Sequence, residues 1–206
     1  MTRVIVLAVV AAVALLGTAC PGPSAGSIFP MTVGNVWNRS HYMLYGTAQP
    51  LDTWETGTIT MTALAKANLA NGREVVEFKQ DNTFHYTHPD STVIDTAYMY
   101  MAEVGDSVKS YTSLNDTIGM IVMLLNPAAN QTWQDSGATA TVIGQEDVSV
   151  AAGTYKGAWK VQLGTGSQGL YQWFARGTGM VKQHEDNTNL GYELVYDEEL
   201  TSATIK

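Results

Sequence analysis

A strict alternation of polar and apolar side chains over Thr58–Leu64 constrains the fold of this chain more than any other feature. Ile59, Met61 and Ala63 point to one face of an extended segment, and the threonines between them point to the other. A period of two is typical of a strand with one face in the core and one in solvent. This segment therefore predicts a half-buried β-strand.

The same pattern recurs along the chain, with turn residues between its repeats. Asn71-Gly72 favours a hairpin turn, because both residues tolerate a positive φ. Short strands at such regular spacing are typical of antiparallel β proteins. We therefore predict an all-β (or mainly β) fold, as an antiparallel open barrel, a wrapped sheet or a sandwich. The further predicted strands are Glu74–Lys79, Thr92–Met101, Thr139–Ile143, Val148–Val150, Ala158–Leu163, Leu170–Ala175, Gly179–His184 and Gly191–Tyr196.

One apolar segment allows two interpretations. Leu114, Ile118, Ile121 and Leu125 follow helical spacing, and Pro127 comes after them. This pattern predicts a helix near 113–125, capped by Ser113 and Asp116, around which the sheet would wrap. The alternative is a buried strand over Met120–Leu125, because that run is apolar on all sides.

Two parts of the sequence resemble each other. Tyr98–Lys109 aligns without gaps on Tyr171–Lys182, with Tyr, Ala, Val and Lys in common. A proline, a turn and a tryptophan also precede each part, ending at Trp37 and at Trp133. We predict an internal duplication with repeats over 28–110 and 125–200, which bears on architecture and not on activity.

The N-terminus has the layout of a secretory signal. Arg3 precedes an apolar run from Val4 to Leu16, and small residues lead to Cys20, the single cysteine. The run is shorter than the roughly 20 residues of a membrane-spanning helix. We predict a signal peptide over 1–19 and a lipid on Cys20; the alternatives are ordinary signal-peptidase cleavage and an uncleaved anchor.

A segment rich in proline, glycine and serine follows the cysteine. Residues 20–27 carry no charge and no apolar periodicity, which is typical of a flexible tether. We expect a single β-rich domain over 28–206. The protein is then anchored by lipid in the cell envelope, outside the cytoplasm, at the outer membrane or cell surface, or is soluble in the periplasm or secreted.

Three motifs resemble a group of uncharacterised bacterial lipoproteins and secreted proteins. They are Phe29–Trp37, Val148–Tyr155 and Trp173–Lys182. Ala151 stands where that group usually has proline, and Thr178 where it usually has valine. Some relatives are similar to periplasmic lipoprotein carriers, in which an open half-barrel wraps a helix and holds acyl chains. The resemblance implies a fold family and a lipoprotein, and it implies no reaction.

The sequence offers little for catalysis. His85, His88 and Asp90 are the metal-like cluster, but side chains three apart on a strand point to opposite faces. We interpret this segment as an exposed loop and expect no enzyme and no cofactor. A metal-dependent hydrolase that uses these three residues is the remote alternative.

Composition limits the partners. The chain has 19 Asp and Glu against 11 Lys and Arg, a net charge of −8, which argues against nucleic acid and anionic lipid surfaces. Methionine-lined surfaces adapt to varied ligands. We therefore expect a membrane-anchored module that binds or presents an apolar ligand, or docks on an envelope protein; the alternative is a structural or assembly lipoprotein with a filled core. The methionines behind this expectation are Met43, Met61, Met99, Met101, Met120, Met123 and Met180.

Overall fold

A computed structural model describes residues 26–47, 51–135, 137–164, 169–189 and 192–206. The predicted signal peptide, Cys20 and most of the tether lie outside the described residues. Across the described ranges no segment forms a helix, so none offers an apolar helix that could span a membrane. The strands are β1 Val36–Gly46, β2 Asp52–Asn68, β3 Glu74–Thr87, β4 Asp90–Val104, β5 Ser107–Tyr111, β6 Met120–Leu124, β7 Thr132–Asp135, β8 Ala138–Val150, β9 Gly153–Leu163, β10 Leu170–Ala175, β11 Gly179–Asn189 and β12 Tyr192–Thr204.

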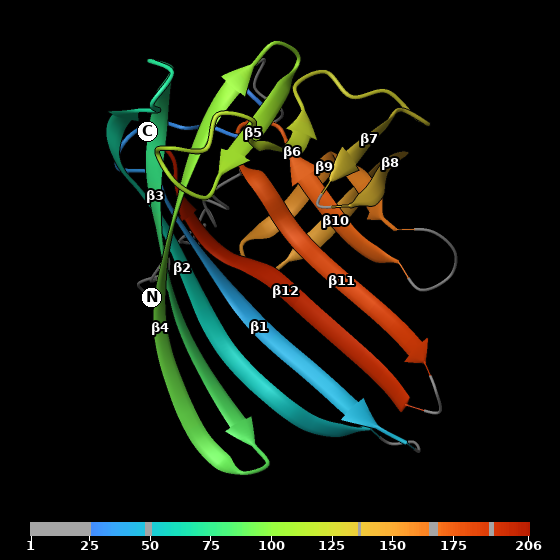
Figure 1. Ribbon diagram of the computed structural model, residues 1–206. Helices are drawn as coiled ribbons and strands as arrows, with labels where there is room; N and C mark the ends of the chain where they lie inside the picture. Colours follow the sequence, from blue (N-terminus) through green and yellow to red (C-terminus); the bar gives the residue numbers. More distant parts are fainter. Residues whose placement is uncertain (1–25, 48–50, 136, 165–168, 190–191) are drawn as a thin grey trace, which may run out of the picture.

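All these strands belong to one antiparallel sheet, so the all-β prediction is confirmed. The strand order is β6-β5-β4-β3-β2-β1-β12-β11-β10-β9-β8-β7. Each half of the chain is thus a six-stranded meander, and the two meanders join where β1 pairs with β12. Figure 1 shows this sheet curling into a nearly closed barrel. Of the three predicted architectures, the single sheet corresponds to the open barrel or wrapped sheet and not to the sandwich.

The alternation read from the sequence decides which side chains point inward. Trp37 lies opposite Met61 in the β1–β2 ladder, and both are buried. Arg39 and His41 follow Trp37 at steps of two on β1, so they share its inner face. The bulge at Asn38/Arg39 shifts the register with β12 and places Arg39 opposite Leu200.

The N-terminal segment fills one end of the barrel, which we call the closed end. Ile28 and Phe29 are buried there, and Phe29 stacks on Trp37 with ring centroids 5.5 Å apart. Gly179, at φ +91°, comes so close that a Cβ atom at this position would lie 2.8 Å from the Phe29 ring. The backbone N–H of Gly177 donates to the carbonyl of Ser27 and fixes the segment's entry.

The opposite end, which we call the open end, is built from fewer strands. Only Tyr100–Val104 of β4 pair with β5, so Asp90–Met99 have one edge without a ladder in the described structure. Figure 1 shows β1, β2, β3, β4, β11 and β12 running beyond the shorter strands toward the lower end. The barrel is therefore filled at the closed end, and at the open end its wall is missing on one side.

The predicted helix near 113–125 is wrong. Met120–Leu124 form strand β6, which pairs with β5, as the alternative interpretation had it. The Asp116 carboxylate accepts hydrogen bonds from the backbone N–H groups of Thr112, Ile118 and Gly119, and so it orders a loop instead of starting a helix. Gly119, at φ +65° against the Tyr111 ring, turns the chain into the strand.

Several local predictions are confirmed. Gly72 has φ +84° in the β2–β3 turn. The predicted strands Thr139–Ile143 and Val148–Val150 are parts of the single strand β8, which bulges between them. Trp37, Trp133 and Trp173 are buried, and Trp159 packs partly buried against the core.

The topology gives the two similar sequence segments equivalent places. Tyr98–Lys109 spans the β4–β5 hairpin and Tyr171–Lys182 the β10–β11 hairpin, which are the fourth and fifth strands of their meanders. Trp37 and Trp133 each stand second in the first strand of a meander. Descent from a duplicated ancestor stays a prediction.

Candidate ligand-binding site

The barrel interior contains a cavity of about 120 Å³ just beneath the closed end. Its walls come from both meanders and are mainly apolar. We call it the methionine cavity, after the four methionines that line it. The lining residues are Phe29, Arg39, Met61, Gln80, Met99, Met101, Val122, Gln172, Phe174 and Met180.

Strand register brings these residues together. Met61 pairs with Gln80 across β2 and β3, and Phe78 pairs with Met99 across β3 and β4, so Met61, Gln80 and Met99 share the inner face. On the other meander Phe174 pairs with Met180 after a bulge. The flexible thioether side chains leave a space about as large as the 150 Å³ apolar cavity that is known to hold benzene.

Arg39 supplies a positive charge at this apolar cavity. Its side chain is 6% exposed and lies on β1, one step of the inner face below Trp37. Desolvation by burial lowers the pKa of Arg39, while the nearby Glu198 carboxylate and Tyr196 oppose that shift. Nε of Arg39 has no hydrogen-bond partner among the described residues.

Polar side chains form a belt on the inner face beyond the cavity, toward the open end. The belt consists of His41, Glu55, Tyr196 and Glu198. His41 Nε2 lies 2.9 Å from Glu55 Oε1, without hydrogen-bond geometry, and both residues are buried. The Tyr196 hydroxyl donates to Glu198, and desolvation together with that carboxylate raises the pKa of Tyr196. Phe84 packs against the His41 ring. The belt is therefore rich in carboxylates and aromatic rings.

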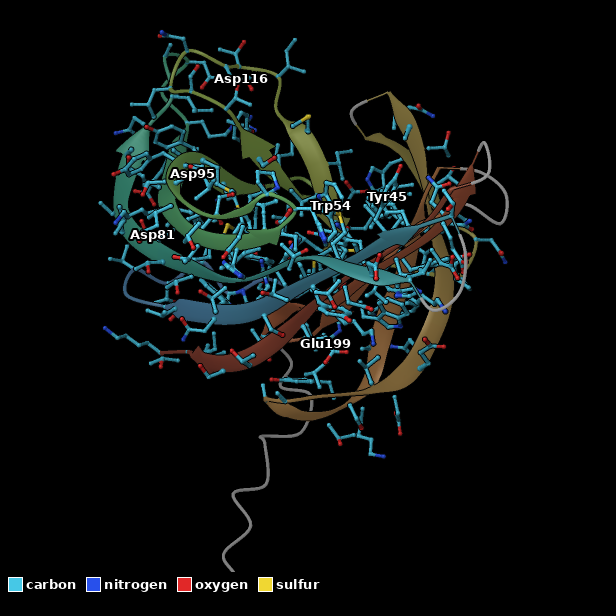
Figure 2. All side chains as sticks on the ribbon, turned by 90° about the horizontal axis from the view of Figure 1, so that it is seen from below. Tyr45, Trp54, Asp81, Asp95, Asp116 and Glu199 are labelled. Atoms are coloured by element: carbon cyan, nitrogen blue, oxygen red, sulfur yellow. The ribbon has the colours of Figure 1, made fainter. Side chains whose placement is uncertain are left out.

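Aromatic side chains mark the open end itself. Trp54 contacts Tyr45 edge to face, with centroids 5.5 Å apart, and stacks on His88 at 5.9 Å. Figure 2 looks toward this end and shows Tyr45 and Trp54 close together there.

The three metal candidates are not gathered into one site. His85 Nε2 lies 3.6 Å from Asp90 Oδ1, whereas the His88 ring stacks on Trp54. All three are exposed, as predicted, but the segment is not a loop: His85 lies in β3, Asp90 begins β4, and only His88 lies in the turn between them. Within the described ranges no group of three or more His, Cys, Asp or Glu side chains is placed to hold a metal ion.

The methionines of the sequence predicted part of this site, but they did not predict its charged residues. Met61, Met99, Met101 and Met180 line the cavity, but Met120 is 39% exposed and Ile118 is 80% exposed. The polar residues of the inner face were not predicted from the sequence. The available signal was their alternation with core residues, which places them on the core face of strands β1, β2 and β12; they are Arg39, His41, Glu55 and Glu198.

Comparisons with known proteins are sparse. No protein family and no curated protein matches the chain. The chain is similar to a solved structure of a candidate lipoprotein from Parabacteroides distasonis ATCC 8503, with 13% identity and a TM-score of 0.45. The similarity covers 88% of this chain and 100% of that one. A likeness this distant carries no argument about function.

Proposed function

We propose that the chain is a lipid-anchored bacterial envelope protein whose barrel interior binds the apolar part of a small ligand. The methionine cavity is the observation that carries this proposal. An interior normally packs without voids larger than a water molecule. The apolar side chains that line this space gain contacts when an apolar group fills it.

The position of the tether supports a free entrance. Ser27 is fixed at the closed end through its carbonyl, and Ile28 and Phe29 plug that end. A chain anchored at Cys20 is thus joined to the domain at the end away from the opening. The open end then remains accessible to a ligand from the envelope space.

Cavity filling tests the binding role. All strands and buried residues of the described structure lie within 28–206, so a chain of residues 21–206 keeps every described contact. Val122→Phe fills the methionine cavity, and Ile143→Phe, at a site 45% exposed on β8, is the matched control. We expect 1-hexanol to bind the wild type and the control, and to bind Val122→Phe at least about tenfold more weakly, the equivalent of 1.4 kcal/mol. Equal binding by all three proteins would place 1-hexanol outside the cavity and contradict the proposal, and no binding by the wild type would favour a structural lipoprotein.

Metabolic labelling tests the anchor. Cells that express the full chain are grown with an alkyne-tagged fatty acid, and the label is followed in the wild type and in Cys20→Ala. We expect label and membrane association in the wild type and neither in the variant. A labelled variant, or an unlabelled wild type, would exclude Cys20 as the lipidated residue.

A further inference from the structure

The buried guanidinium of Arg39 bears on what kind of ligand the methionine cavity takes. This inference rests on the proposed binding function and adds the chemical class of the ligand. Arg39 lines the cavity, and its side chain is more than nine-tenths buried. Arginine is almost never found fully buried unless it is paired.

Arg39 has no direct partner for its charge within the described ranges. It forms no ion pair with any described residue, and its Nε donates no hydrogen bond within the described structure. Glu198 is the carboxylate that acts on it, at a distance beyond an ion pair, and Glu198 already accepts the hydroxyl of Tyr196. A buried charge without a partner is costly, so an anion beside Arg39 would remove that cost.

Two carboxamides line the cavity, one from each meander. Gln80 Nε2 donates to Asn82 Oδ1 at 3.0 Å, and Gln172 Nε2 donates to Gln183 Oε1 at 2.7 Å. Each amide group has a second N–H bond, so both can donate once more. Together with Arg39 they give the cavity a set of donors that suits the oxygens of an acid group.

We propose that the ligand is an amphiphile with one carboxylate, which pairs with Arg39 while its apolar part occupies the methionine cavity. Arginine suits carboxylates because its planar fork donates two parallel hydrogen bonds. A single negative charge is favoured over two, because Glu55 and Glu198 lie buried on the same inner face and would repel the second charge.

Three probes of equal chain length test this. Hexanoate, 1-hexanol and hexylammonium are titrated into the chain of residues 21–206, and the Kd values are compared. We expect hexanoate to bind about 10- to 100-fold more tightly than 1-hexanol, as for hydrogen bonds to a charged group. Arg39→Met should abolish that preference and leave the binding of 1-hexanol intact. Arg73→Met, which removes an equal charge from an exposed residue, should keep the preference.

The outcomes separate the two proposals. Binding of none of the probes overturns the binding function and this inference with it. Equal binding of hexanoate and 1-hexanol, or a preference that survives Arg39→Met, overturns the inference alone. Tightest binding of hexylammonium also overturns it and assigns head-group recognition to the carboxylates. If Arg39→Met does not fold, the relative Kd values of the three probes on the wild type still test whether the site prefers a carboxylate.

Discussion

The indole Nε1 of Trp133 on β7 donates a hydrogen bond of 3.0 Å to the carbonyl oxygen of Ile121 on β6. These two strands are the ends of the sheet, and no backbone ladder joins them in the described structure. We call the gap between them the seam. Trp133 is 7% exposed and belongs to the core, so its ring packs at the seam while its N–H joins the edges.

Trp133→Phe should loosen the seam. The phenyl ring keeps most of the packing, but the Ile121 carbonyl loses its donor, and we expect a loss of about 1–3 kcal/mol in the free energy of unfolding. Urea unfolding measures the loss, and amide hydrogen exchange locates it. Faster exchange should concentrate in β6 and β7. Exchange that rises equally in β1 and β12 would show that this bond has no special part in closing the barrel.

Gly179→Ala should destabilise the closed end through a clash as well as through backbone strain. Both Gly179 and Gly72 have positive φ, but a Cβ at Gly72 meets nothing within 4 Å, whereas one at Gly179 meets the Phe29 ring at 2.8 Å. We expect Gly72→Ala to cost about 1–2 kcal/mol, and Gly179→Ala to cost a further ~1–3 kcal/mol. Thermal unfolding of both variants checks this. Equal costs would mean that Phe29 does not hold its place in the core.

Tyr196→Phe should cost more stability than Tyr42→Phe. The Tyr196 hydroxyl donates to the buried Glu198 carboxylate, while the exposed Tyr42 hydroxyl lies 3.3 Å from that of Thr53. Loss of a hydrogen bond to a buried charge costs about 1.5–3 kcal/mol, and loss of an exposed one costs much less. Urea unfolding at neutral pH compares the two variants. Similar losses would contradict a buried polar belt.

The loop around Asp116 should depend on pH in a defined range. Three backbone N–H groups, those of Gly119, Ile118 and Thr112, lower the pKa of Asp116 from its usual 3.8. A lowered pKa means that the ordered loop is fully favoured above pH 3.8 and is lost as the pH falls through the lower folded-state value. Amide chemical shifts of Ile118 and Gly119 should titrate below pH 3.8, and Asp116→Ala should remove the titration. A midpoint at or above 3.8 would contradict these hydrogen bonds.

The sequence predicted the sheet but not its closure. Alternation such as that of Thr58–Leu64 is local, so a strand can be recognised without knowing its neighbours. The helix prediction failed because Leu114 and Ile118 match helical spacing by coincidence. They lie in a loop that Asp116 and Gly119 shape, and spacing alone contains no information about those contacts.

The candidate site was predictable only in part, for a similar reason. The abundance of methionine pointed to an adaptable apolar site, and Met61 and Met180 do line one cavity. The burial of Arg39 beside Glu198 depends on the pairing of β1 with β12, two strands at opposite ends of the chain. No local sequence pattern predicts which strands pair. The alternation of Arg39 with core residues is therefore not enough to predict that its charge is buried.

Methyl NMR of the chain of residues 21–206 with ¹³C-labelled methionine tests the central proposal most directly. On titration with 1-hexanol, the methyl signals of Met61, Met99, Met101 and Met180 should shift and saturate together, because these side chains line one cavity. The signal of Met120, which is 39% exposed on β6, should stay in place. Shifts that do not saturate, or that appear at Met120 without the four cavity methionines, would contradict ligand binding inside the barrel.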